Sequence, residues 1–226
     1  MGGINTRGTS GANKTFLNIF QNRLVLEYMN KEDLERKLNS LNLDVGMILS
    51  RKKVKGKHEG KTAYYYNLDN VEGMMTNIRV HEGKFGDFLE VELTDVEEKY
   101  SISLGDIYSR MSKDFIRRVD NLDVTKEIDF SLWSISEEDS DNGKAYSGVT
   151  IYQNEKKVEY AMTFKDLVPP IEKKRGRKVK WDFSDQDEQL FEVLENFRKE
   201  NFKEDVVEEK KESKPVDNTK KDDMPF

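Results

Sequence analysis

The chain has 226 residues, of which 36% are charged and 35% hydrophobic, and its formal net charge is −6. This size and polarity fit one folded domain with solvated extensions, while an aromatic content of 10% argues against disorder throughout. The absence of cysteine excludes disulfides and thiolate metal sites and favours a reducing compartment. No signal-like apolar segment follows Met1 and no stretch approaches the roughly 18 apolar residues of a membrane span, so we expect a cytoplasmic protein without membrane contact.

The first expected elements are an arm, a hairpin and a short helix. Residues 1–13 are rich in Gly, Ser, Asn and Thr, which predicts a flexible arm. The apolar, β-prone segment 16–28 is broken at Gln21-Asn22, a pattern typical of a β-hairpin. Asn30 is a suitable N-cap for a helix. That helix would carry three leucines on one side: Leu34, Leu38 and Leu41.

Three consecutive segments then alternate apolar and polar residues, as half-buried strands do. They span 74–81, 88–93 and 99–104, and the short turns between them predict an antiparallel meander. The side chains expected on the buried face are Met74, Ile78, Val80, Leu89, Val91, Leu93, Tyr100, Ile102 and Leu104.

The period changes to that of an amphipathic helix after Gly105. The apolar residues that recur at every fourth position are Ile107, Met111, Phe115 and Val119. Two further strands are expected at 128–135 and 149–153. A turn at Asn154-Glu155 should then lead into a last strand, whose apolar residues are Val158, Tyr160, Met162 and Phe164.

Three strands, one helix and two strands form the element order of the OB-fold, a five-stranded Greek-key barrel with its helix between the third and fourth strands. We therefore predict a mainly β chain whose residues 14–168 form an OB-like five-stranded Greek-key barrel with an N-terminal extension. An antiparallel sandwich is the alternative, and the position of the single helix favours the barrel.

The region after the barrel is expected to contain a linker, a helix and a tail. Pro169-Pro170 ends the strand region, and residues 169–203 should form a basic linker, including the run 173–180, and a C-terminal helix. This helix is predicted from Ser184, as its cap, to about Phe202. Its apolar side carries Leu190, Leu194 and Phe197. Residues 204–226 are charged and without periodicity, which predicts a disordered acidic tail.

The last residues of the tail are Asp222, Asp223, Met224, Pro225 and Phe226. An acidic pair followed by an aliphatic residue, Pro and Phe resembles the tip of bacterial single-stranded DNA-binding proteins. A barrel followed by a charged tail also resembles the layout of that family and of the bacteriophage proteins with the same role. The resemblance implies a protein that binds single-stranded DNA with little sequence preference during phage replication or recombination, in the cytoplasm of a bacterial host. It also implies that the tip recruits replication or recombination proteins.

A sequence-tolerant binder of single strands needs cations along the phosphates and aromatic faces that can stack on bases. Segment 51–66 offers both, because basic residues directly precede three tyrosines. The first candidate set is Arg51, Lys52, Lys53, Lys55, Lys57, Lys61, Tyr64, Tyr65 and Tyr66. On a strand, Tyr65 would face opposite to Tyr64 and Tyr66. The alternative is that the tyrosines complete the core and the lysines solubilise a loop.

A second candidate set lies out of phase with the apolar faces of the predicted strands. It consists of Arg79, Phe88, Trp133 and Tyr152. Large rings exposed on a polar face gain nothing for the fold and would suit binding. The equally weighted alternative is that the N-terminal hairpin or the C-terminal helix covers them. The basic run 173–180 is a third candidate for phosphate contact, with a solvated linker as its alternative.

The sequence carries no P-loop, Rossmann glycine pattern or G-x-S-x-G motif, and His58 and His81 lie in no cluster typical of metal ligands. We therefore predict a protein that is not an enzyme and holds neither cofactor nor metal. Two other functions stay open: an interaction or assembly module that binds no nucleic acid, and an RNA-binding OB protein.

Overall fold

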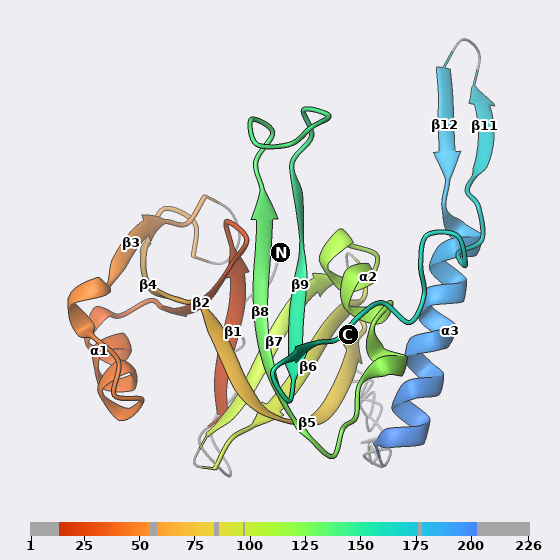
Figure 1. Ribbon diagram of the computed structural model, residues 1–226. Coiled ribbons are helices and arrows are strands. Elements are labelled where there is room, and N and C mark those ends of the chain that lie inside the picture. Colours follow the sequence, from red (N-terminus) through yellow and green to blue (C-terminus); the bar gives the residue numbers. More distant parts are fainter. Residues whose placement is uncertain (1–13, 55–57, 84–85, 97, 176–177, 203–226) are drawn as a thin grey trace, which may run out of the picture.

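The structure is a computed structural model that describes residues 14–54, 58–83, 86–96, 98–175 and 178–202 (Figure 1). The chain is mainly β. Its strands are β1 (Lys14–Phe20), β2 (Arg23–Tyr28), β3 (Leu49–Lys52), β4 (Thr62–Leu68), β5 (Asn70–His81), β6 (Phe88–Thr94), β7 (Lys99–Asp106), β8 (Glu127–Ile135), β9 (Tyr146–Gln153), β10 (Lys156–Lys157), β11 (Ile171–Arg175) and β12 (Lys178–Asp182). Its helices are α1 (Lys31–Ser40), α2 (Arg110–Ile116), α3 (Ser184–Asn201) and the 3₁₀ turns η1 (Val45–Met47) and η2 (Val119–Asn121). Within the described ranges, no helix has both the length and the apolar character to cross a membrane.

Within the described residues, β1 to β10 form one mixed sheet in the order β10-β9-β8-β5-β6-β7-β1-β2-β4-β3, and β11 and β12 form a separate ribbon. Neighbours in the large sheet are antiparallel except for β7 and β1, which pair in parallel. The sheet curls strongly enough that β2 also contacts β8. Its inner face carries the hydrophobic core, at whose centre Leu17, Ile78, Val91, Ile102 and Phe130 are completely buried.

The predicted five-stranded barrel is not closed. β9 pairs with β8 and β10, while β1 occupies the edge of β7 that a closing strand would use. Helix α2 contacts both β7 and β9 and lies between them. The strands on either side of this opening are therefore separated by a helix, and we call the opening the seam.

Most of the local predictions are confirmed. Gln21 and Asn22 have φ of 50° and 58°, the left-handed conformation of a tight hairpin turn between β1 and β2. The side chain of Asn30 accepts a hydrogen bond of 2.9 Å from the amide of Glu32 and caps α1. The meander β5-β6-β7, helix α2 and the pair β8-β9 also occur where the alternation of apolar residues predicts them.

The face assignment of Met74 is wrong. β5 carries a bulge between Met75 and Asn77, and the extra residue reverses the alternation on one side of it. Met75 is therefore buried together with Ile78, whereas Met74 is only half-buried.

The predicted strand 158–164 is also wrong. The residues that follow helix α2 form hydrogen bonds with the backbone of this segment, so it does not pair as a strand. Nε of Arg117 donates to the carbonyl oxygen of Met162 at 2.9 Å, and the Arg118 guanidinium donates to that of Val158 at 2.5 Å. The amide of Ala161 donates to the carbonyl of Arg117 at 2.8 Å. Lys156–Lys157 pairs with β9, the amide of Val158 donates to the carbonyl oxygen of Ile151 at 2.8 Å, and the chain then leaves the sheet.

Helix α3 spans the predicted region, but Ser184 is not its cap. The N-cap position is Phe183, which has no side-chain oxygen to offer. Asp182 instead accepts hydrogen bonds from the amide of Ser184 at 3.1 Å and from its hydroxyl at 2.5 Å. The predicted apolar side is confirmed, since Leu190, Leu194 and Phe197 are buried.

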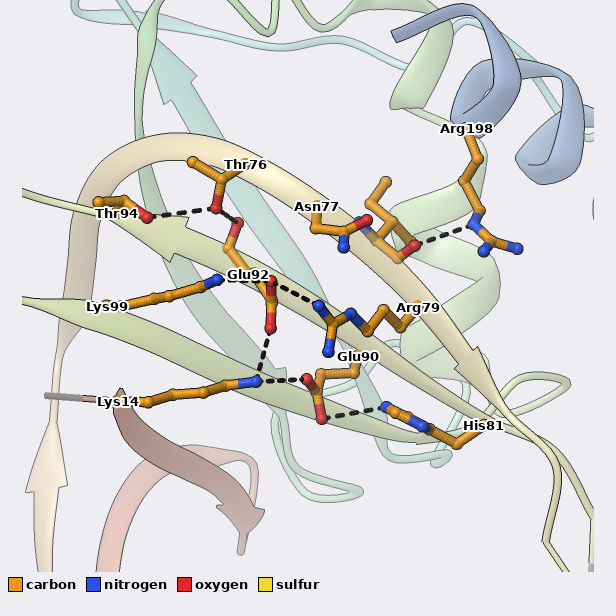
Figure 2. A network of polar contacts seen from close by, with 11 residues as sticks. Lys14, Thr76, Asn77, Arg79, His81, Glu90, Glu92, Thr94, Lys99 and Arg198 are labelled. Carbon is orange, nitrogen blue, oxygen red and sulfur yellow. Dashed lines mark hydrogen bonds and ion pairs between the residues drawn. The ribbon is translucent and has the colours of Figure 1, made fainter. Parts of the chain in front are cut away.

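A buried carboxylate joins β5, β6, β7 and β1 on the face of the sheet opposite to the core (Figure 2). Glu92 on β6 is 1% exposed, and its oxygens lie 2.5 Å from Nζ of Lys14 and 3.1 Å from Nζ of Lys99. The guanidinium of Arg79 lies 3.7 Å away. Burial opposes the ionisation of Glu92, but the hydrogen bonds from Lys14 and Lys99 outweigh it and lower the pKa of this carboxyl. The ionised side chain thus links β1 to β6 across β7.

Replacing Glu92 by glutamine should lower the free energy of unfolding by about 3 kcal/mol, because three cations lose the charge that neutralises them. Since the pKa of Glu92 is lowered in the folded state, its stabilisation is present above the pKa of an unfolded glutamate and disappears as the pH falls through the lowered value. The difference between the two proteins should therefore shrink in acid. Urea denaturation at about pH 7 and about pH 3 measures this difference.

The matched control is Glu127→Gln, at an exposed position of β8. Equal losses from the two substitutions, or a loss at Glu92 that does not depend on pH, would contradict the prediction.

Candidate nucleic-acid interface

Two cavities meet at Arg110 and Ser147, which line both of them. The first has a volume of about 480 Å³ and lies among α2, the base of the β8-β9 hairpin, the segment after β10 and the start of α3. The second has a volume of about 630 Å³ and is bordered by the ends of β1 and β7, the start of β6 and the residues of β3. Because both lie at the seam between β7 and β9, we call them together the seam groove.

The cavity near β3 has a cationic wall. Arg51 and Lys53 line it, and both pair with Glu27, which is 6% exposed on β2. The guanidinium of Arg51 also lies over the ring of Phe20, 3.5 Å from its centroid. Tyr65 packs edge-on against the same ring at 5.4 Å. Arg51 is therefore held in a fixed position by an acid on one side and an aromatic ring on the other.

The cavity near α2 is rich in aromatic rings, and several of them are exposed. Phe164 is 78% exposed, Tyr108 48% and Phe183 44%, while Trp133 and Tyr146 are half-buried. Their exposed surface contributes nothing to the core, although single exposed rings are common on proteins. With Tyr160, six rings line this one cavity and form a surface on which planar groups can stack.

Rings and guanidinium groups alternate along one wall of this cavity. The guanidinium of Arg117 lies between Phe164 and Tyr160, 4.0 Å and 4.2 Å from their centroids. Arg118 lies over Tyr160 at 3.8 Å. Such cation–π contacts orient both partners. The stack therefore places Phe164, its outermost ring, at the surface, while both arginines are almost completely buried.

Asp114 on α2 positions this stack. It accepts a hydrogen bond of 2.5 Å from the hydroxyl of Tyr160 and one of 2.8 Å from the amide of Val149, and Arg118 lies 3.8 Å away. Burial, and then the hydrogen bond to Asp114, raise the pKa of Tyr160. Burial likewise lowers the pKa of Arg117. The carboxylate of Asp114 thus contacts Tyr160, the backbone of β9 and Arg118 at the same time.

Gly148 allows Trp133 to lie close to β9. The two residues are register partners in the β8-β9 pair. A Cβ atom on Gly148 would lie 2.9 Å from Cε2 of Trp133 and 2.5 Å from Oδ2 of Asp114. Any side chain at this position would therefore displace both the indole and the carboxylate.

Two more cations belong to the groove. Arg110, at the start of α2, donates to the carbonyl oxygen of Ala145 at 2.8 Å and lies 5.0 Å from the centroid of Tyr146. Lys113, one turn further along, lies 5.8 Å from the centroid of Phe183 and pairs with Asp187 of α3. Arg110 is exposed at the junction of the two cavities.

The structure brings four of the residues predicted from sequence into the groove. Arg51, Lys53 and Phe88 line the cavity near β3, and Trp133 lines the cavity near α2. The second candidate set is therefore divided, because Phe88 and Trp133 lie in the groove and its other two members do not.

The remaining predicted residues lie elsewhere. Tyr64 and Tyr66 pack against the hydrophobic core, as the alternative interpretation of the tyrosines holds, whereas Tyr65 faces Phe20 on the opposite side of the sheet. Arg79 contacts Glu92, and Tyr152 lines a separate cavity near Asn154 and Glu155. Lys52 and Lys61 are exposed on β3 and beside β4, outside the residues that line the groove.

Several predictions from the sequence concern parts of the chain outside the described residues. These are the arm 1–13, Lys55, Lys57, the tail from Glu204 onward and its tip Asp222, Asp223, Met224, Pro225 and Phe226.

Sequence reasoning missed most residues of the cavity near α2. Arg110, Lys113 and Arg117 follow one another at spacings of three and four, which places them on one side of the α2 region and could have indicated a basic face. Tyr108 follows Ile107 of the apolar helix stripe, and this position alone does not indicate an exposed ring. Phe164 was expected to be buried in a strand, and no local signal indicates that it would stack on Arg117.

Compared with models of protein families, with curated proteins and with solved structures, this chain matches none of them.

Substituting Gly148 by alanine should destabilise the protein by about 1–3 kcal/mol and change the fluorescence emission of Trp133, because the new methyl group overlaps the indole and Asp114. Thermal denaturation and emission spectra of a Trp181→Phe background, in which Trp133 is the only tryptophan, measure the two effects. Thr150→Ala, two residues along the same face of β9, is the control. Unchanged emission and stability in Gly148→Ala would show that Trp133 does not pack on this strand.

Proposed function

We propose that this protein binds single-stranded nucleic acid, and single-stranded DNA in particular, with unpaired bases lying in the seam groove. The observation that carries the proposal is the row of exposed rings beside fixed cations in two adjoining cavities that share Arg110 and Ser147. Stacking of a base on an aromatic side chain is worth about 1–3 kcal/mol and works for every base, since every base has a π face. Phe164, Tyr108 and Phe183 offer such faces.

Cations along the groove would contact the phosphates. Arg51 and Lys53, whose side chains stay 24% and 22% exposed beside Glu27, lie at one end, Arg110 at the junction, and Lys113 at the other end. The net charge of −6 does not oppose this, because exposed charges more than about 8 Å apart are largely screened at physiological salt and the local field decides. Neutralising phosphates releases counterions, so binding should weaken as salt rises.

The groove suits a single strand better than a duplex. In a duplex the faces of the bases are stacked on one another, so exposed rings would find no partner there. In a single strand the bases turn out of the stack at small cost and enter cavities such as the one of about 480 Å³ around Trp133.

The arrangement of strands supports a relationship to the OB architecture, which is part of the same proposal. From β5 to β9 the chain runs through three meander strands, helix α2 and two further strands, as predicted for an OB-like unit. In this interpretation the unit is opened between its third and fifth strands, β7 and β9, and the groove occupies the opening.

The proposal also includes the biological role that the tail motif implies. The protein would coat single-stranded DNA without catalysis in phage replication or recombination, in the bacterial cytoplasm. The residues Asp222, Asp223, Met224, Pro225 and Phe226 would recruit replication or recombination proteins, since an exposed peptide with an aromatic residue and acids can dock in an apolar, basic pocket.

Titration with fluorescently labelled oligo-dT, duplex DNA and oligo-rU tests the proposal by anisotropy, with intrinsic Trp133 emission as a second signal. We expect tight binding of oligo-dT at low salt, weak binding of duplex, and loss of binding at high salt. Phe164→Ala should weaken binding of oligo-dT by about five- to a hundredfold, because one stacking face is lost. Arg110→Ala should also weaken binding of oligo-dT. It should lower the slope of log K against log salt by the amount expected for about one phosphate contact.

Tyr152→Ala is the matched control, because this half-exposed ring lies on β9 outside the groove and its loss should change affinity little. No response to any of the three nucleic acids would favour an interaction module that binds none. A preference for oligo-rU would favour the RNA-binding alternative.

A further inference from the structure

The ribbon formed by β11 and β12 projects from the start of α3, away from the large sheet (Figure 1). Five register pairs join its two strands, from Ile171 with Asp182 to Arg175 with Lys178. A two-stranded ribbon is at best marginally stable by itself, because it has no third strand or helix to cover a face. A ribbon that projects from the protein in this way is therefore better explained as a binding element for another molecule than as part of the core.

The side chains of the ribbon expose large apolar groups. Trp181 is 52% exposed, Val179 54% and Ile171 52%. By strand alternation, Trp181 and Val179 share one face, while Lys173 and Lys180 lie opposite each other on the other face. An exposed indole on a projecting strand gains nothing for the fold and is available for stacking.

The ribbon is also strongly basic. Its described residues 171–175 and 178–182 include five lysines or arginines and two acids, Glu172 and Asp182. The exposed side chain of Lys173 pairs with Asp182 at the base of the ribbon. Excess positive charge beside an aromatic ring is the combination that a single strand of nucleic acid requires.

The base of the ribbon is continuous with the seam groove. Phe183 lines the groove, and Trp181 is two residues before it on β12. Asp187, which pairs with Lys113 of the groove, belongs to the first turn of α3 directly after the ribbon. A strand that leaves the groove past Phe183 therefore meets the ribbon next.

We infer that the β11-β12 ribbon continues the path of single-stranded nucleic acid beyond the seam groove, and this inference rests on the proposed function. Trp181 stacks on a base, and Lys173 and Lys180 contact the neighbouring phosphates. Paired strands are only about 5 Å apart, so the ribbon is narrow. A nucleic-acid strand that stacks on Trp181 and passes over one edge of the ribbon meets Lys173 and Lys180 on the other face. The groove holds the first few nucleotides and the ribbon holds the following ones.

The chain contains two tryptophans, and they report separately on the two parts of this path. In Trp181→Phe the remaining tryptophan, Trp133, lies in the groove; in Trp133→Phe the remaining one, Trp181, lies on the ribbon. Each variant is titrated to saturation with oligo-dT of about four and of about sixteen nucleotides, which span the range of site sizes known for single OB folds. The short oligonucleotide should quench Trp133 only, whereas the long one should quench both.

Affinity measurements by anisotropy complete the test. Trp181→Ala should weaken binding of the long oligo-dT by about five- to a hundredfold and leave binding of the short one unchanged. The double variant Lys173→Ala/Lys180→Ala should lower the slope of log K against log salt by about 1.4, or about 0.7 for each phosphate contact, for the long oligonucleotide only. Lys156→Ala/Lys157→Ala removes two exposed strand lysines with the same change of charge on β10 and should leave that slope unchanged.

The outcomes separate the two proposals. If Trp133 responds to no oligonucleotide, the proposed function itself is wrong. If Trp133 responds but Trp181 responds at neither length, or responds to duplex DNA instead of oligo-dT, the groove stands and the role of the ribbon is overturned.

Discussion

A strand edge carries unpaired N–H and C=O groups, and in this molecule the edge of β7 is paired with β1. A parallel partner from the N-terminal hairpin thereby replaces the strand that would close a five-stranded barrel. β1 covers the part of this edge from Lys99 to Ile102. β9 pairs with β8 and β10 and not with β7, and α2 contacts both β7 and β9. The groove, its rings and its cations all lie along the opening that this one pairing leaves.

Buried carboxylates on the large sheet determine where several of the cations lie. Two carboxylates on the sheet, Glu27 and Glu92, are almost completely buried, and each is surrounded by cations from neighbouring strands. Such buried charges cost desolvation unless they are paired, so each carboxylate fixes the positions of its partners. This is why Arg79, a plausible phosphate contact in the sequence, is placed beside Glu92, while Arg110 lies at the exposed junction of the groove.

Strand and helix positions follow from local patterns, and these were predictable. The alternation around Val91 and Ile102 and the four-residue period from Ile107 identified β6, β7 and α2, since burying one face of an element needs only that element's own sequence. The predictions were wrong where the local structure depends on contacts with residues that are distant in the sequence. The bulge after Met75 depends on the register with β6, and the segment from Val158 to Phe164 left the sheet because Arg117 and Arg118 hold its carbonyls.

For the candidate site, the sequence by itself determined the kind of chemistry: cations and aromatic rings in excess of what a core needs, with Arg51, Lys53, Phe88 and Trp133 among the residues that line the groove. Only the tertiary structure decided which rings gather, bringing Phe164 onto Arg117 and placing Tyr108 and Trp133 in the wall of one cavity. The physical reason is that every amphipathic strand presents the same backbone edge, so local sequence does not specify which strand pairs with β7. The identity of the strand that pairs with β7 decides where the sheet stays open, and thereby which side chains face each other.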